Sequence, residues 1–455
     1  MVFPAETPAA DPEVAPAARP QRVSAYPWFA LALLIVTYLF AYIDRQVLGI
    51  LAQPVKAELH ISDTALGFLG GSTFALFYAT LGLPLARLSD HFPRRGVVSL
   101  ALALWSVMTT LTALVGNFWQ LLALRIGVAV GEAGCNPGAH SLIADYFPVR
   151  QRATAMALYG LGIPFGIGLG MLIGGYAAQH YGWRAAFLAL GAPGLLFALV
   201  LRLGMREPVR GASDTHRTGG EIDEHIPVRR LLSYLLSLRS FVHMVAGISL
   251  QAVAMTGGAM WNPAFLMRSH GLTVGAVGLT LGLLQCLAGG AGSLAGGVLA
   301  DRLQRYGAAR QLSVPVFACL LACPLALGAY VTSEARIALV LIAATVFLQN
   351  VQYGTTTSLF SRLSPLRGRG LISGLSLFAT NFVSTLLGVQ GVGILSDLLR
   401  PRFGDESLRC SLMAAAGVFF LWAAGHYVLA ARDIARDLDP IEGGAARTEL
   451  TEGGR

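Results

Sequence analysis

Twelve apolar runs limit what this chain can fold into more than any other feature of its sequence. Lipid offers the backbone no hydrogen-bond partner, so a spanning segment has to be a helix or part of a closed barrel. A helix needs about 20 residues to cross a hydrocarbon core of about 30 Å. The runs lie near residues 28–53, 65–86, 97–116, 119–141, 153–178, 184–203, 240–266, 275–299, 311–331, 336–361, 371–396 and 408–430. They predict an all-α membrane protein with twelve transmembrane helices.

Composition excludes most soluble functions. Apolar residues make up 55% of the chain and charged residues only 13%, with a mean hydropathy of +0.61. Such values are far from those of soluble globular domains. The net charge of +8 does not indicate nucleic-acid binding, because the arginines gather in alternate connections between the runs, with one exception near residues 400–409. By the positive-inside rule, both termini are predicted to be cytoplasmic, in a bacterial inner membrane.

The spacing of the runs divides the chain into two halves. Residues 26–204 and 240–431 each hold six runs, and residues 205–239 form the long internal connection. The second part of this linker, PVRRLLSYLLSLRS, has leucines on one side of a helix and arginines on the other, as an interfacial helix on an anionic membrane surface has. We expect residues 1–25 and 432–455 to be disordered cytoplasmic tails. The five cysteines fall mostly inside apolar runs without acidic or histidine companions, so no disulfide or metal site is expected.

The halves repeat each other. ARLSDHFPRR after the second run matches GVLADRLQR after the eighth, which aligns Asp90 with Asp301. PVRQRATAM after the fourth run matches PLRGRGLIS after the tenth, which aligns Arg150 with Arg367. An internal repeat of this kind is typical of secondary transporters and predicts two six-helix bundles around a central cavity.

GVLADRLQR resembles the cytoplasmic loop of the major facilitator superfamily, and the resemblance extends over about residues 26–431. The first copy departs from the family pattern, since Ala86 and Pro93 replace its two glycines. The strings YIDRQVLGILAQPVKAEL and VGEAGCNP look like the spinster branch, which implies export of sphingoid phosphates or lysophospholipids by alternating access. The resemblance makes these charged residues candidates for conformational gating: Asp90, Arg94, Asp301, Arg302, Arg150 and Arg367.

Four ionisable residues lie deep inside apolar runs. Asp44 and Arg45 share the first run, and Arg125 and Glu132 lie two helical turns apart in the fourth. Such residues are costly in a membrane unless they pair or face a cavity. We expect Asp44 and Glu132 to couple protons, and Arg45 and Arg125 to bind substrate. The alternative is a buried ion-pair cluster that only fixes helix packing.

The C-terminal half offers neutral polar side chains in its runs. Asn262, Gln349, Tyr353 and Asn381 are candidates to line its side of the cavity, which carries no buried Arg or Lys. A charged wall facing a largely apolar one favours a lipid-like anionic substrate. No P-loop is present, so we expect no cofactor, with a proton gradient as the energy source. His140, Ser141 and Asp145 lie too close together on one helix for a catalytic triad, so we expect no enzyme.

The predicted partners are therefore a lipid-like small molecule, protons and the membrane, with no nucleic acid, and the protein is expected to be a monomer. Two other functions stay open at this point. The same architecture could carry a small organic acid or drug, or the chain could be a passive lipid scramblase that uses no proton network.

Overall fold

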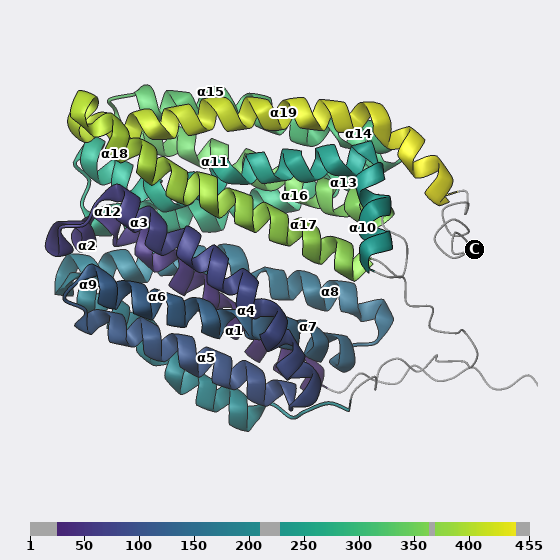
Figure 1. Ribbon diagram of the computed structural model, residues 1–455, viewed down its shortest axis with the longest axis horizontal. Coiled ribbons are helices and arrows are strands. Elements are labelled where there is room, and N and C mark those ends of the chain that lie inside the picture. The colour runs from purple at the N-terminus through teal and green to yellow at the C-terminus, as the bar shows by residue number, and fades with distance from the viewer. Residues whose placement is uncertain (1–24, 210–227, 364–368, 443–455) are drawn as a thin grey trace, which may run out of the picture.

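The structure, a computed structural model, describes residues 25–209, 228–363 and 369–442, and it contains helices and no strand in those ranges. Figure 1 shows two layers of roughly parallel rods, one from each half of the chain. We call the end at which α2 and α3 lie the closed end, and the opposite end, at which α10 lies, the linker end.

The N-terminal half forms six rods, several of which are interrupted. Its helices are α1 (Tyr26–Ile50), α2 (Ala52–Leu59), α3 (Asp63–Gly70), α4 (Ser72–His91), α5 (Arg94–Leu111), η1 (Thr112–Leu114), α6 (Phe118–Ala133), α7 (Cys135–Tyr146), α8 (Val149–Gly160) and α9 (Gly162–Gly204). Helix α9 contains two rods, because Gly182 has a φ of +85°, which only glycine adopts without strain. The second rod pairs α3 with α4, and the fourth pairs α6 with α7.

The C-terminal half also forms six rods, preceded by the linker helix. Its elements are α10 (Val228–Ser237), α11 (Arg239–His270), α12 (Val274–Leu284), η2 (Gln285–Gly289), α13 (Gly290–Gln304), α14 (Ala308–Gln311), α15 (Ser313–Val331), α16 (Ala335–Leu363), α17 (Arg369–Ser384), η3 (Thr385–Gly391), α18 (Val392–Phe403), η4 (Gly404–Glu406) and α19 (Ser407–Glu442). The segments η2 and η3 are π-helical and interrupt the eighth and eleventh rods.

The predicted all-α fold with twelve helices is confirmed. Eight stretches of the described chain are long and apolar enough to cross a membrane. Two of them, residues 154–204 and 376–438, each hold two rods. The second and fourth rods, which are broken into two helices at Gly71 and Gly134, are not among the eight. The six single stretches, the four rods in the two double stretches and these two interrupted rods make twelve.

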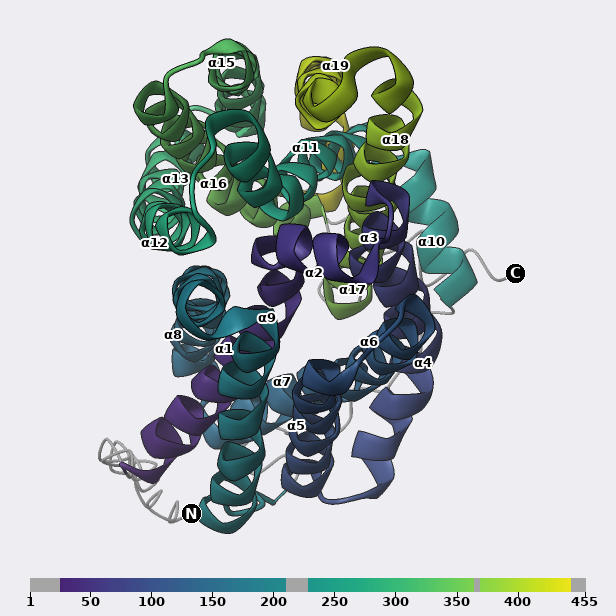
Figure 2. The ribbon, with the colours of Figure 1, turned by 90° about the vertical axis from the view of Figure 1, so that its left-hand side faces the viewer.

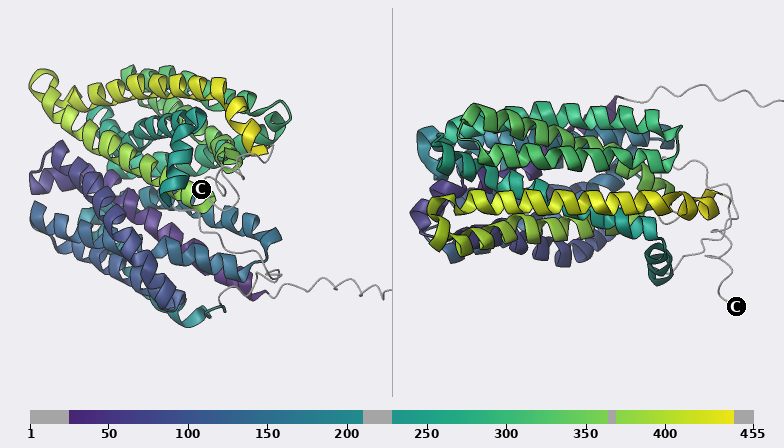
Figure 3. Two further views of the ribbon diagram at one scale, coloured as in Figure 1. Left: turned by 45° about the vertical axis from the view of Figure 1, so that its right-hand side comes forward. Right: turned by 90° about the horizontal axis from the view of Figure 1, so that it is seen from above.

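The two bundles meet at the closed end and diverge toward the linker end, as the left view of Figure 3 shows. Seen from the closed end in Figure 2, α2 and α3 lie between the bundles. At this end the Gln46 side chain donates to the backbone oxygen of Ala259, 2.9 Å away. Gly67 of α3 packs so closely on η3 that a Cβ there would lie 3.0 Å from the Val389 oxygen. Polar contacts and small residues therefore hold the bundles together at one end.

One boundary prediction is wrong. Residues 432–442, predicted as part of a disordered tail, continue helix α19. Ile434 and Leu438 are buried there, and Asp437 accepts a hydrogen bond from the backbone nitrogen of Ser240 at 2.9 Å. This carboxylate caps the first turn of α11, which explains why a polar stretch after the last apolar run stays folded.

The first bundle caps its own helix at the linker end in the same way. Glu207, just beyond α9, accepts hydrogen bonds from the backbone nitrogens of Arg94 and Arg95 at 3.1 and 2.9 Å. A carboxylate at the start of α5 satisfies free N–H groups and complements the helix dipole. The start of the linker therefore belongs structurally to the N-terminal bundle.

Candidate functional site

Helix α1 presents Asp44 and Arg45 on different faces, because successive residues of a helix point about 100° apart. Asp44 is buried, whereas the Arg45 side chain keeps 24% of its surface exposed. Asp44 and Arg45 lie near the closed end, because the next residue, Gln46, donates a hydrogen bond to the opposite bundle there. Of the two ions, Arg45 is the one that solvent can reach.

Arg45 is paired with Glu132 of α6. Its Nε lies 2.6 Å from a Glu132 carboxylate oxygen, and Glu132 is buried. The guanidinium also lies 5.0, 4.8 and 5.3 Å from the ring centroids of Tyr42, Phe74 and Tyr78, respectively. Aromatic faces attract a cation at these distances. We call these three rings the aromatic cage.

Asp44 and Arg125 lie beside this pair without completing it. Among the described residues, neither makes an ion pair, although each lies within electrostatic range of the other and of Glu132. Arg125 reaches only the backbone oxygen of Asp44, at 3.4 Å. One carboxylate oxygen of each acid, and the Arg125 Nε, are buried without a described hydrogen-bond partner. The four predicted residues are thus brought together, and one ion pair, Arg45–Glu132, is formed among them.

Sequence reasoning missed the polar and aromatic groups around the aromatic cage. Tyr159 of α8 donates to the Asn136 side-chain oxygen at 3.1 Å, and Asn136 of α7 donates to the Tyr78 hydroxyl at 3.1 Å. Tyr38 stacks on Tyr159 with centroids 4.3 Å apart. Part of this was visible, since Tyr38, Tyr42 and Arg45 are spaced four and three residues apart and so share a face of α1.

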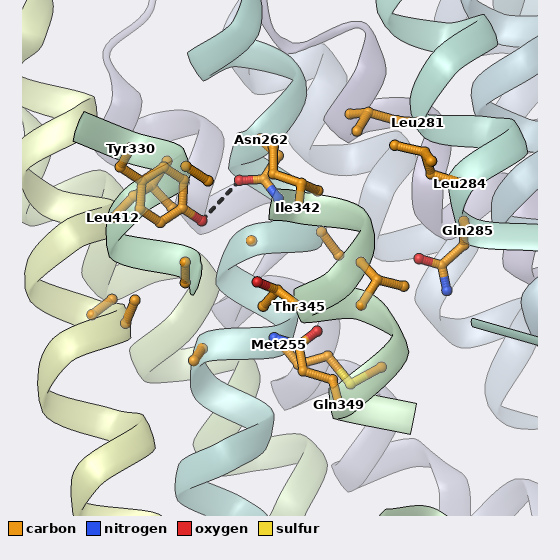
Figure 4. Close-up of a pocket in the computed structure, with 18 of the residues that line it drawn as sticks. Met255, Asn262, Leu281, Leu284, Gln285, Tyr330, Ile342, Thr345, Gln349 and Leu412 are labelled. Carbon is orange, nitrogen blue, oxygen red and sulfur yellow. Dashed lines mark hydrogen bonds between the residues drawn. The ribbon is translucent and has the colours of Figure 1, made fainter. Parts of the chain in front are cut away.

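A pocket lies mainly in the C-terminal half, and Ile167 and Met171 of α9 complete its lining. Figure 4 shows Asn262, Gln349, Thr345 and Gln285 around it, with the Tyr330 hydroxyl donating to the Asn262 oxygen at 2.9 Å. The rest of the lining is apolar apart from Asn350, and none of the described residues in it is charged. Asn262 and Gln349, predicted from the sequence, do line this pocket.

Tyr353 and Asn381, predicted to join them, are not among the residues that line this pocket. Asn381 is exposed and donates to Leu377 of its own helix at 2.9 Å. Tyr353 is 54% exposed, and it lies within electrostatic range of Tyr42 in the other bundle. It therefore borders the space between the bundles.

The predicted gating residues divide into three groups. Asp301 and Arg302 are exposed in the last turns of α13, and Asp301 has no ion pair with a described residue. Arg94 is buried at the start of α5, where it pairs with Asp145 and with Glu207. Its contacts therefore join helices of one bundle in this conformation. Asp90 and Arg150 lie in α4 and α8, but their side chains are outside the described part, as is all of Arg367.

An ionic cluster at the closed end escaped the sequence analysis. The Asp63 carboxylate, only 2% exposed, accepts two hydrogen bonds from Arg268 at 2.6 and 2.7 Å. It also accepts from Lys56 at 2.6 Å and from the Ser396 hydroxyl at 2.8 Å. Also between the two bundles, the Asp397 carboxylate accepts a hydrogen bond from the backbone nitrogen of Thr64 at 2.6 Å. We call this cluster the closed-end latch. Asp63 lies outside the predicted apolar runs, so the cost of burying a charge in the membrane did not mark it in the sequence.

Burial alone would raise the pKa of Asp63. The hydrogen bonds and positive charges of Arg268 and Lys56 outweigh burial and hold this pKa well below its ordinary value. The carboxylate therefore stays ionised, and the closed-end latch intact, over the whole range of moderately acidic and neutral pH.

Two six-helix bundles thus meet at one end, and the Arg45–Glu132 ion pair lies in the first of them. Residues 34–389 match the Major Facilitator Superfamily. The chain belongs to the major facilitator superfamily. Its relatives and structural neighbours are transporters and not enzymes.

Curated relatives include efflux and spinster proteins. The MFS-type efflux pump of Mycolicibacterium smegmatis is 32% identical over 415 residues, which are 90% of this chain and 94% of the relative. Protein spinster homolog 3 of Danio rerio is 32% identical over 246 residues, 53% of this chain. The aligned part covers 49% of that relative, so only about half of its length is matched.

Among solved structures, the chain is similar to a bacterial homologue of the human lysosomal transporter Spinster in an inward-facing, unoccupied conformation. The TM-score is 0.82 with 28% sequence identity, covering 90% of this chain and 98% of the other. The same homologue in an occupied conformation gives a TM-score of 0.79. The predicted resemblance to the spinster branch is confirmed.

Proposed function

We propose that this transporter is proton-coupled and carries an amphiphilic anion, such as a lysophospholipid or a sphingoid phosphate, by alternating access. The observation that carries the proposal is the Arg45–Glu132 ion pair, which is buried on the Glu132 side and open to solvent on the Arg45 side. An acid held ionised by an arginine can take up a proton only as that arginine leaves. Arg45 would then be free to bind an anionic headgroup.

The contrast between the two bundles supports an amphiphilic substrate. The N-terminal bundle holds the Arg45–Glu132 pair with two further ionisable side chains, Asp44 and Arg125, beside it. The pocket of the C-terminal bundle is apolar with a few amide and hydroxyl groups. A headgroup would be bound by the first and a hydrocarbon chain by the second.

The orientation in the membrane is part of the proposal. Arginines concentrate in the connections at the linker end, which by the positive-inside rule would face the cytoplasm with both termini. The structure is then an inward-facing conformation, like that of the solved spinster homologue, of a monomer in a bacterial inner membrane. Protonation of Asp44 and Glu132 would be coupled to the movement that opens the closed end.

Transport in proteoliposomes tests the proposal. Lysophosphatidic acid and sphingosine phosphate should raise the melting temperature of the purified protein, because a ligand that binds the folded state stabilises it. An imposed pH gradient should then drive the better ligand against its concentration gradient. Transport that ignores the pH gradient would instead indicate a passive scramblase.

A second substrate class is favoured by two relatives. The mycobacterial relative is called an efflux pump, and a Bacillus subtilis relative, 26% identical over 76% of this chain, is a probable galactarate/D-glucarate transporter. Stabilisation by glucarate or by a cationic drug, with none by the lipids, would replace the lipid substrate by a small organic acid or drug.

A further inference from the structure

Five side chains from four helices form a closed circuit around Arg45. Tyr159 of α8 donates to Asn136 of α7, which donates to Tyr78 of α4. On the other side, Tyr159 stacks on Tyr38, and Tyr38 meets Tyr42 edge-on with centroids 5.1 Å apart. The circuit ends on the guanidinium, which lies against both Tyr42 and Tyr78.

Asn136 is the only member of this circuit without an aromatic ring. Its side-chain oxygen and nitrogen are both used, one toward each tyrosine, and neither of these hydrogen bonds goes to the ion pair itself. Tyr159 is buried, so its hydroxyl depends on Asn136 for a partner. Loss of the amide would free Tyr78 to rotate away from the guanidinium.

The position of Arg45 matters because of what it does to Glu132. The Arg45 Nε lies 2.6 Å from the carboxylate, whose second oxygen has no described partner. The titratable or charged groups that bear on Glu132 come from four helices: Asp44 and Arg45 on α1, Tyr78 on α4, Arg125 on α6 and Cys135 on α7. Of these, only Arg45 touches the carboxylate, so it is the main group that stabilises the ionised form against burial, which favours the neutral acid.

We infer that Asn136 and the hydroxyls of Tyr78 and Tyr159 are positioning residues that hold Arg45 on Glu132 and so set the pH at which Glu132 takes up its proton. This inference rests on the proposed function, because it assigns a role in the same proton-coupled site. Loosening the circuit weakens the ion pair and favours the neutral acid, so the protonation midpoint should rise. The circuit acts through Arg45 and not through a direct bond to Glu132.

Infrared difference spectroscopy on the purified full-length protein measures this midpoint without transport. The carboxylic acid band that disappears in Glu132→Gln identifies Glu132, and it is followed between about pH 5 and about pH 9. Asn136→Leu removes both hydrogen bonds at similar volume, and Tyr78→Phe and Tyr159→Phe each remove one while keeping the ring. We expect each variant to raise the midpoint by roughly half to one pH unit, with the pH at half-maximal transport moving in the same direction.

The matched control is Tyr427→Phe in the C-terminal bundle. Tyr427 is as buried as Tyr159, and its hydroxyl contacts Gln251 and Gln352 at 3.1 and 3.2 Å. This variant should lower the melting temperature and leave the Glu132 midpoint unchanged.

Two outcomes would overturn the inference, and they are distinct. A wild-type band that titrates, with an unchanged midpoint in all three circuit variants, would leave proton coupling standing and reduce the circuit to packing. The absence of any titrating Glu132 band in the wild-type protein would overturn the proposed coupling and the positioning role together.

Discussion

Replacing Asp63 with asparagine should open the closed end of the molecule. Asparagine keeps the size of the side chain and can still accept from Ser396, but it removes the negative charge that faces Lys56 and Arg268. Those two side chains are only 16% and 13% exposed. Removing one partner of a buried ion pair costs about 3 to 5 kcal/mol, because the remaining charge is left uncompensated.

This cost falls on the conformation in which the latch is made. Asp63 belongs to the first bundle, whereas Arg268 and Ser396 belong to the second, so separating the bundles at this end breaks the contacts. Taking the lower figure, about 3 kcal/mol, and about 1.4 kcal/mol for each tenfold change, the population ratio should move by about a hundredfold toward the opened state. A closed conformation that the wild type favours by less than about a hundredfold would then become the minority.

Distances between spin labels measure this shift. Labels at Ala57 in α2 and Arg402 in α18 would both be exposed at the closed end, one on each bundle. In Asp63→Asn the distance distribution should gain a longer component. Glu58→Gln is the control, because it breaks the contact of Glu58 with Arg184 inside the first bundle at the same end. An unchanged distribution in Asp63→Asn would refute the assignment of the latch.

The pH dependence of the latch follows from the lowered pKa of Asp63. A carboxyl with a lower pKa in the folded protein contributes stability above its ordinary pKa. That contribution is lost only as the pH falls toward the lowered value. The wild-type distance distribution should therefore not change through Asp63 between about pH 5 and about pH 8.

Three further predictions concern the ionisable residues of the two bundles. Asp44→Asn should keep the fold and remove the pH dependence of transport in proteoliposomes, so a normal response to a pH gradient would reject Asp44 as a protonation site. Because Arg45 and Glu132 contact each other, Arg45→Met and Glu132→Gln should each impair transport, and the double variant should be less impaired than the sum; additivity within about 0.5 kcal/mol would indicate independent roles. Asp301→Ala should leave the melting temperature nearly unchanged, since Asp301 is exposed here. If Asp301 makes its contacts only in the opposite conformation, the same change should increase the labelling of engineered cysteines from the linker end.

The twelve rods could be predicted because every span has to be an apolar helix long enough to cross the membrane. Apolar length alone located them, even where Gly182 separates two rods within one continuous stretch of helix. The breaks at Gly71 and Gly134 were not predictable in the same way, since glycine in a membrane helix also serves close packing. The extension of α19 depends on a contact between Asp437 and Ser240, nearly 200 residues apart in the chain.

The candidate site was predictable as far as burial of charge could indicate it. Asp44, Arg45, Arg125 and Glu132 stood out because ions at membrane depth are costly. Which of them pair could not be deduced, because that depends on the rotation of α1 relative to α6. Asn136 carried no charge to mark it, and its role depends on contacts with two other helices.

The caps at the linker end bear on how the two halves are joined. Glu207 caps α5 within the first bundle and Asp437 caps α11 within the second, so neither of these two caps crosses between the bundles. Among the described residues, each of these two caps therefore ties the linker end of a bundle to its own half of the chain. If the chain is divided between residues 209 and 228, each fragment keeps its own cap, and we expect the two fragments to reassemble at the closed end when they are co-expressed.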